Sequence, residues 1–160
     1  MNREIIVKIS NQKLYLLKKA QILKVYPVST SRFGIGSKSG SSKTPLGSHR
    51  ISNKIGKNAP LGAIFIKRRN TGKIAKIRKR TSDLSQDLIT TRIMRLEGLK
   101  SGLNKGSGID TYQRCIYIHG TPDEGLIGKS ASHGCIRMKN RDIIDLFNLV
   151  KRNTLVCIEK

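Results

Sequence analysis

The sequence predicts a mainly β protein of the β-sandwich or β-barrel type, with one helix in its last third. Apolar and polar residues alternate from Ile5 to Ile9, and the pattern continues through Leu14 to Lys18 and Ile22 to Ser29. This is the period of a strand with one face in water, which favours antiparallel pairing over a buried parallel sheet. Between Asn140 and Val150, by contrast, apolar residues recur at helical spacing.

The length of the chain predicts a single domain over residues 1–160. A content of 37% apolar residues is enough for one core of ordinary size. The sequence has no internal repeats and no linker long enough to divide it.

The segment after the first strands predicts a loop. Ser31 to Lys43 is rich in Ser, Gly and Lys, and it forms either one wall of a substrate cleft or a plain connection between strands. Pro45 and Gly47 then define a tight turn, from which a strand over Ser48 to Asn53 begins. His49 lies in that strand, where a packing role is more common than catalysis.

The second half of the chain predicts two further strands, the helix and a last strand. Strand character returns from Leu88 to Leu99, before a loop over Gly98 to Gly108. Cys115 to His119 predicts a central strand, because its four consecutive apolar residues are hard to expose on either face. Asn140 is the expected cap of the helix, and Leu155 to Ile158 the last strand.

The chain is strongly basic. Thirty-two Lys and Arg residues against ten Asp and Glu give a formal charge of +22, which predicts attraction to anionic polymers or surfaces. Lys67 to Arg80 holds eight basic residues in fourteen and no acid. We interpret this run first as a solvated segment and second as an edge that contacts an anionic wall or membrane surface. No specific nucleic-acid interface is expected, because aromatic platforms and a recognisable module are missing.

The three cysteines differ in their surroundings. Cys115 and Cys157 lie in apolar runs, so we predict that both are small buried apolar residues. No spacing suggests paired metal-ligating cysteines, so neither a metal nor a cofactor is expected. Cys135 alone lies among Ser, His and Gly residues.

The segment Ser132-His133-Gly134-Cys135 predicts an active-site turn. A thiol is nucleophilic as thiolate, and an imidazole can remove its proton. His119 ends an apolar run and is followed by Gly120, so a loop from Gly120 to Ala131 can bring it back to Cys135. We therefore predict Cys135 as nucleophile and His119 as general base, and we expect Cys135 to have a lowered pKa and to be the most reactive of the three thiols.

The same turn supplies groups for binding. The backbone amides of His133, Gly134 and Cys135 are candidate oxyanion donors, because Gly134 allows them to point one way. Arg137 either binds a substrate carboxylate through a bidentate fork or forms an ion pair inside the turn. Ser132, His133, Gly134 and Arg137 are thus the predicted oxyanion and substrate-binding residues.

His119-Gly120, followed by Ser132-His133-Gly134-Cys135, resembles the signature of the L,D-transpeptidase catalytic domain family (YkuD type) of bacterial peptidoglycan enzymes. Thr44-Pro45-Leu46-Gly47 is similar to the TPxG turn of that family, Thr91 to Leu96 to its strand before the active site, and Asp142 to Phe147 to its helix after the cysteine. Some members carry Asn where this chain has Arg137.

The resemblance implies a fold, a substrate and a place in the cell. It implies the YkuD-type β fold, with the carbonyl at the position of Gly120 orienting the imidazole. It implies peptidoglycan stem peptides as partners, 3→3 cross-linking, a role in cell-wall biogenesis and cell shape, acylation by carbapenems and location in the cell envelope. The amino terminus from Met1 to Lys8 is neither a signal peptide nor a membrane span, so we expect either that an export segment was removed or that the start is atypical.

Several alternatives stay open at this level. With water as acceptor the protein is an L,D-carboxypeptidase, and with a protein amine it is an anchoring enzyme. In a different class it is a non-catalytic basic domain that binds anionic wall polymer or nucleic acid. A papain-like protease is disfavoured, because there the cysteine precedes the histidine along the chain. The oligomeric state is unknown from the sequence.

Overall fold

The computed structural model describes residues 2–81 and 87–160, and in these residues it confirms a mainly β protein with one α-helix. The strands are β1 (Arg3–Lys8), β2 (Lys13–Lys18), β3 (Gln21–Pro27), β4 (Gly47–Ile55), β5 (Ala63–Ile66), β6 (Arg69–Ile74), β7 (Ile89–Gly98), β8 (Tyr117–Gly120), β9 (Ile136–Met138) and β10 (Leu155–Glu159). The helix α1 comprises Asn140–Leu149, and a short 3-10 turn, η1, comprises Glu124–Leu126. In the described residues, no helix has the length and apolar character needed to cross a membrane.

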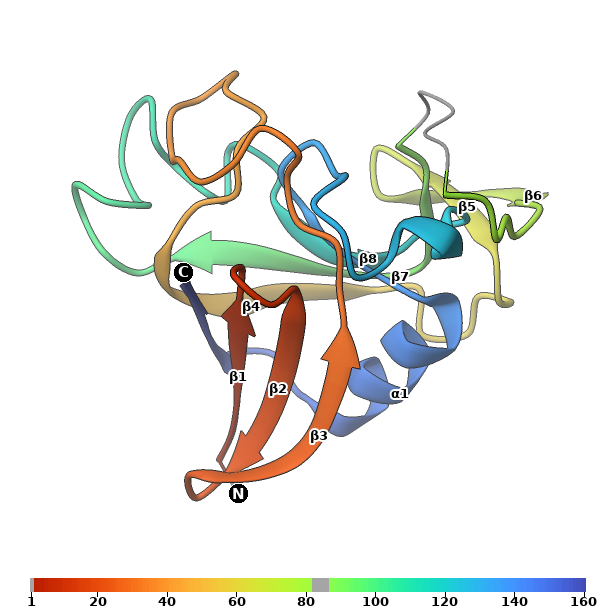
Figure 1. Cartoon of the computed structure of the whole chain (residues 1–160), viewed down its shortest axis with the longest axis horizontal. Coiled ribbons are helices and arrows are strands. Elements are labelled where there is room, and N and C mark those ends of the chain that lie inside the picture. Colours follow the sequence, from red (N-terminus) through yellow and green to blue (C-terminus); the bar gives the residue numbers. More distant parts are fainter. Residues whose placement is uncertain (1, 82–86) are drawn as a thin grey trace.

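The strands join in one bent sheet. Its order is β3-β2-β1-β10-β4-β7-β5-β6, while β8 pairs with β7 and β9 pairs with β8. Figure 1 shows β1, β2 and β3 running steeply across the direction of β4 and β7, with α1 packed against β7 and β8. Most pairs are antiparallel as predicted, but β1 with β10 and β8 with β9 are parallel. Alternation reports which side chains are buried and not the direction of the neighbouring strand, so the sequence did not reveal these two pairs.

The main core fills the inside of the bend. Its fully buried members come from strands on both arms of the sheet and from α1, and include Ile5, Val7, Leu14, Leu16, Ile51, Met94, Leu96, Ile118, Ile136, Met138, Ile143, Leu146, Val156 and Ile158. Each such side chain contributes about 1.5–3 kcal/mol through burial. The apolar stripe of α1 covers β7 and β8 from this side, so the opposite face of these two strands remains for other contacts.

A second cluster forms on that opposite face. It consists of Ala63, Phe65, Ile93 and Tyr117, and both Cys115 and Cys135 pack against it. Ala63 and Phe65 lie on β5, so the hairpin of β5 and β6 supplies part of this cluster. The two faces of β7 and β8 therefore differ: one is sealed by the main core, and the other holds the thiols.

The basic run is partly a strand, which the sequence did not predict. Residues of β6 are exposed along its whole length, as expected for a solvated segment. Ile66 pairs with Arg69 across a two-residue turn, in which Lys67 and Arg68 have φ of 47° and 66°. A strand with both faces in water lacks the alternation of apolar and polar residues by which strands are recognised, so β6 could not be predicted from the sequence.

Asn140 is the first residue of α1 and not its cap, so the predicted capping role is wrong; the cap position is Lys139. The Asn140 side chain is fully buried. Its Oδ1 accepts hydrogen bonds from the hydroxyls of Thr90 (2.6 Å) and Thr91 (2.5 Å), and its Nδ2 donates to the carbonyl of Thr121 at 2.8 Å. Asn140 thus ties the helix to β7 and to the loop after β8.

His49 is a buried packing residue of β4. Its Nδ1 lies 2.9 Å from the carbonyl oxygen of Gly47, and its Nε2 lies 3.0 Å from the hydroxyl of Thr111. A neutral ring that donates from Nδ1 and accepts at Nε2 satisfies both partners. Burial lowers the pKa of His49 from its ordinary value of 6.5 to about 4.

We expect His49 to make the stability of the protein depend on pH. The unfolded chain protonates this ring near pH 6.5 and the folded chain only near pH 4, so the free energy of unfolding falls as pH drops through this window, by about 3 kcal/mol for this group. His49→Gln keeps a donor and an acceptor but cannot titrate. Urea unfolding at pH 7 and pH 4.5 should therefore show a smaller difference in the variant.

An equal pH dependence in wild type and His49→Gln would contradict the assignment.

Candidate active site

The pairing of β8 with β9 brings the two predicted catalytic residues to one face. Ile118 pairs with Ile136 and both lie in the main core, while His119 pairs with Arg137. Because side chains alternate along a strand, His119 and Arg137 face the side of the second cluster. Cys135, one residue before β9, packs on that same side. The segment from Gly120 to Ala131 thus returns the chain so that histidine and cysteine lie on adjacent segments, as the sequence predicted.

The thiol of Cys135 is held by backbone groups. The amide of Tyr117 donates to its Sγ at 3.3 Å, and the thiol donates to the carbonyl oxygen of Cys115 at 3.6 Å. Desolvation raises the pKa of Cys135 to about 12; the Tyr117 amide opposes this increase and the charge of Asp87 adds to it. The expectation of a lowered pKa is therefore wrong: in this arrangement the resting group is a neutral thiol.

The imidazole of His119 is fixed in one tautomer. It is 1% exposed, and its Nδ1 lies 2.6 Å from the carbonyl oxygen of Gly120. Nδ1 therefore carries the proton and donates it to that carbonyl, which leaves Nε2 with its lone pair. Burial lowers the pKa of His119, and the negative charge of Asp87 counteracts part of this effect. The imidazole is thus neutral and able to accept a proton.

The close approach of the backbone at Gly120 excludes a side chain there. A Cβ at this position would lie 2.6 Å from the carbonyl oxygen of Thr90 and 2.8 Å from Oδ1 of Asn140. Neither atom belongs to a flexible chain end, because the Asn140 amide is held by Thr90, Thr91 and Thr121. Glycine at position 120 therefore allows β8 to approach β7 and α1 closely, and the Gly120 carbonyl stays within hydrogen-bond distance of the imidazole.

The turn before Cys135 is held by hydroxyl groups. Ser132 Oγ donates to the carbonyl of Cys135 at 2.6 Å and accepts from the amide of Gly134 at 3.2 Å. Thr44 Oγ1 donates to the carbonyl of Gly134 at 2.9 Å, so the Thr-Pro-Leu-Gly segment stabilises the turn through this hydrogen bond. Gly134 has φ of +125°, and a Cβ would lie 3.3 Å from the carbonyl oxygen of Lys43. Both facts favour glycine at this position.

Two of the three predicted oxyanion donors already have acceptors. The amide of His133 donates to Asp87 Oδ2 at 3.2 Å, and that of Gly134 donates to Ser132. For the amide of Cys135 no acceptor is found among residues 2–81 and 87–160. The donor that this turn offers to a new ligand is therefore the Cys135 amide.

Asp87 is the residue of the site that the sequence analysis missed. Its Oδ1 lies 3.0 Å from Arg137 Nη1, and its Oδ2 lies 3.1 Å from His133 Nδ1. Burial tends to raise the pKa of Asp87, but electrostatic interactions with His119 and Arg137, together with hydrogen bonds from His133 and Arg137, give a net lowering. Asp87 is ionised, and one of the two roles left open for Arg137 is realised: it forms an ion pair inside the site. Asp87 lies among polar residues without periodicity, so the only available signal was its proximity in sequence to the predicted strand.

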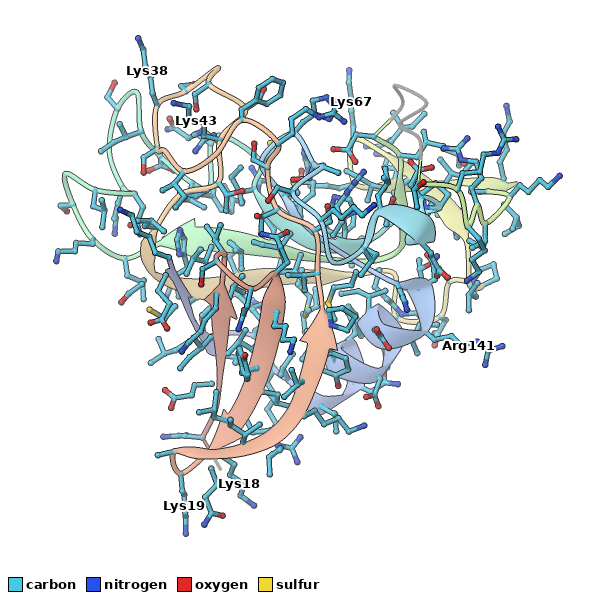
Figure 2. The ribbon with its side chains drawn as sticks, in the orientation of Figure 1. Lys18, Lys19, Lys38, Lys43, Lys67 and Arg141 are labelled. Atoms are coloured by element: carbon cyan, nitrogen blue, oxygen red, sulfur yellow. The ribbon has the colours of Figure 1, made fainter. Side chains whose placement is uncertain are left out.

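Seven of the eight cations of the basic run fall into two groups; the eighth, Arg80, is exposed and follows Lys79. Arg68 Nη1 donates to the hydroxyl of Tyr117 at 3.0 Å, and Arg78 and Lys79 pair with Asp123 and Glu124. The second group is exposed, and within the described residues no ion pair involves it; its members are Lys67, Arg69, Lys73 and Lys76. Figure 2 shows Lys67 toward the same end of the molecule as Lys38 and Lys43, opposite Lys18 and Lys19. We name this second group the hairpin cations.

Among the described residues, no three or more His, Cys, Asp or Glu side chains lie together in a way that could hold a metal ion. The chemistry available at this face is that of a thiol, an imidazole, a carboxylate and a guanidinium.

The family model of the L,D-transpeptidase catalytic domain, YkuD, matches residues 2–158. The chain belongs to the YkuD family. YkuD of Bacillus subtilis (strain 168) is 49% identical over 43 residues, which are 27% of this chain and 26% of that protein. YkuD of Bacillus licheniformis is 51% identical over 41 residues, 26% of this chain and 25% of that protein. The aligned stretches thus span about a quarter of these relatives.

Solved structures show the same fold at low identity. An L,D-transpeptidase from Mycobacterium smegmatis matches with a TM-score of 0.62 and 17% identity, over 99% of this chain and 59% of that one. The L,D-transpeptidase LdtMt1, solved in complex with imipenem, matches with a TM-score of 0.58 and 16% identity, over 98% of this chain and 58% of that one. This YkuD domain thus spans about three fifths of the length of both.

The neutral thiol predicts an unusual pH dependence of alkylation at Cys135. Iodoacetamide reacts with the thiolate, so with a pKa of about 12 the rate at Cys135 should rise about tenfold per pH unit from pH 7 to pH 10 without a plateau. Peptide mapping of the folded YkuD domain separates Cys135 from Cys115 and Cys157. A plateau of the Cys135 rate near neutral pH would instead reveal a preformed thiolate.

Proposed function

We propose that this YkuD domain is a peptidoglycan L,D-transpeptidase in which Cys135 carries the acyl group and His119 moves the proton. The observation that supports this most directly is the arrangement of β8 and β9, which presents both side chains on one face while Gly120 fixes the imidazole tautomer. The donor is the tetrapeptide stem of peptidoglycan, cut between its diamino acid at position three and the terminal D-Ala. This chemistry is that of a cysteine acyltransferase.

Acylation begins from two neutral groups. As Sγ of Cys135 forms a bond to the amide carbonyl carbon, Nε2 of His119 takes the thiol proton, so that no free thiolate accumulates in a site that disfavours charge. The carbonyl oxygen becomes an oxyanion, and the Cys135 amide is the donor available to it. Collapse of this intermediate breaks the carbon–nitrogen bond, and the leaving amine of D-Ala takes the proton from His119.

Transfer reverses the same steps with a new amine. His119, again neutral, takes a proton from the amine of a second stem as this amine attacks the thioester. The thiol of Cys135 leaves and regains its proton, and the product is a 3→3 cross-link. With water as acceptor the same site is an L,D-carboxypeptidase, so the ratio of cross-linked dimer to tripeptide stem identifies the acceptor. The substrate places this activity in the cell envelope.

Imipenem tests the nucleophile directly, because a solved relative in this family was obtained as an imipenem complex. Intact mass should show one adduct on the wild-type domain, none on Cys135→Ser, and one on Cys115→Ser, the matched control from the same cluster. Peptide mapping should place the adduct at Cys135. An adduct that persists in Cys135→Ser would remove Cys135 as the nucleophile.

Replacing the base tests the pairing. His119→Ala should slow stem turnover by about 10²–10⁴-fold, the usual contribution of a general base. Added to Cys135→Ala it should cost nothing more, because the two residues serve one proton transfer. Substantial turnover by His119→Ala would contradict the proposed role.

The hairpin cations supply an electrostatic contact with an anionic wall or membrane surface. Lys67, Arg69 and Lys73 lie on the hairpin of β5 and β6, and Lys76 follows β6 by two residues. The hairpin also contributes Phe65 to the second cluster beside Cys135. A polymer attracted to the hairpin is therefore brought to the side of the molecule that holds the thiol. Long-range attraction of this kind increases encounter rates and is screened by salt.

Neutralising the hairpin cations to Gln should weaken sedimentation with intact sacculi by about tenfold at low salt, while turnover of a small soluble stem stays unchanged. Added salt should mimic the effect on wild type, since the Debye length is about 10 Å at 0.1 M. The matched control neutralises four cations around one groove at the opposite end, Lys18, Lys19, Lys151 and Arg152. Equal losses in both variants would show that only net charge matters.

A further inference from the structure

We propose that Asp87 is a positioning residue of this site, whose carboxylate clamps the turn around Cys135 and holds a negative charge beside the His119 imidazole. The proposal rests on the proposed roles of Cys135 and His119. It assigns a function to an acid that lies outside the signature of the active-site turn.

The clamp is formed by three contacts from one carboxylate. Asp87 Oδ2 accepts from both the backbone amide and Nδ1 of His133, at 3.2 Å and 3.1 Å. Asp87 Oδ1 accepts from Nη1 of Arg137 at 3.0 Å. His133 lies two residues before Cys135 and Arg137 two residues after it, so one side chain spans the nucleophile on both sides. Such a bridge restricts the backbone that carries the sulfur.

The Arg137 end of the clamp is buried. Its side chain is 2% exposed, and besides Asp87 its Nη2 donates to Ser29 Oγ at 3.3 Å. A buried guanidinium needs a counter-ion, and Asp87, itself 18% exposed, provides it. The two charges therefore stabilise each other at a point where His119 pairs with Arg137 across β8 and β9.

The same carboxylate acts on the proton acceptor. The ionisable groups that act on His119 from neighbouring elements are Asp87 and, on β9, Arg137, while its partner on β7 is the apolar Ile93. When His119 takes the thiol proton it becomes a cation next to Arg137. Asp87 offsets that repulsion and thus favours the protonated intermediate. Without Asp87, proton transfer from Cys135 becomes less favourable.

Three variants test the proposal. Asp87→Asn removes the charge and keeps the shape, Asp87→Glu restores the charge on a longer chain, and Asp145→Asn is the matched control. Asp145 also accepts two side-chain hydrogen bonds, from Lys24 and Tyr26, but lies on α1 at the edge facing β3. Imipenem acylation is followed from pH 5 to pH 9, and the first-order acylation constant is separated from the binding constant.

We expect Asp87→Asn to lower the acylation constant by about tenfold or more, within the range of general acid–base effects, with the binding constant little changed. In this variant the acid limb of the curve of acylation rate against pH should move to lower pH, because an imidazole without the nearby anion loses its proton more readily. Asp87→Glu should recover part of the rate and the wild-type acid limb, and Asp145→Asn should behave as wild type. If Asp87→Asn does not fold, Asp87→Glu is the test. It should acylate more slowly than wild type, and the acid limb of its pH–rate curve should be that of wild type.

Wild-type acylation and pH profile in Asp87→Asn would overturn the proposal. Faster acylation would also overturn it, because Asp87 would then be blocking the His133 amide. A lower rate with an unmoved acid limb, and no recovery in Asp87→Glu, would reduce Asp87 to a structural role and overturn the proposal too.

Failure of the proposed function is distinguishable from failure of this inference. If wild type forms no adduct with imipenem, the proposed nucleophile fails, and Asp87 is judged by alkylation instead. Asp87→Asn should then react with iodoacetamide faster at Cys135 at pH 9, since an anion near the thiolate is gone, with Cys157 unchanged. Equal Cys135 rates in both proteins would overturn the inference.

Discussion

The geometry of the site depends on the parallel pairing of β8 with β9. Ile118 and Ile136 enter the main core from the two strands and fix their register. A slip of β8 by one residue would turn His119 into that core and remove Ile118 from it, and a slip of β9 would do the same with Arg137 and Ile136. The burial of apolar surface opposes both changes. The chemistry on the second face is thus positioned by apolar side chains that take no part in it.

Burial sets the electrostatic character of the site. The surface of this chain carries most of a net charge of +22, yet the groups around the thiol are balanced: a neutral thiol, a neutral imidazole and the ion pair of Asp87 with Arg137. A permanent thiolate and imidazolium would each need solvation that this face does not offer. In the proposed function, long-range attraction by the exposed hairpin is therefore separate from proton transfer among groups whose charges balance.

The sequence revealed the parts of the site that have local signals. His119 and Cys135 stood out because Gly residues and an apolar run frame them, and α1 because its apolar stripe is continuous. The clamp by Asp87 could not be predicted, since it joins residues 46 and 50 positions apart. The pKa of Cys135 also escaped prediction, because it depends on desolvation by groups brought together only in the fold. Periodicity likewise missed β6, whose faces are both wet.

The position of β10 has a consequence for how the chain reaches this state. β10 lies between β1 and β4, with Ile5 of β1 paired to Val156 and His49 of β4 paired to the same residue. Along the order of the sheet, the two arms are therefore joined by a strand some 150 positions away from β1. Pairing over such separations is entropically costly and slow. Until β10 is in place, the edges of β1 and β4 that it covers stay open, so the order of the sheet is complete only after every other strand of this domain has been made.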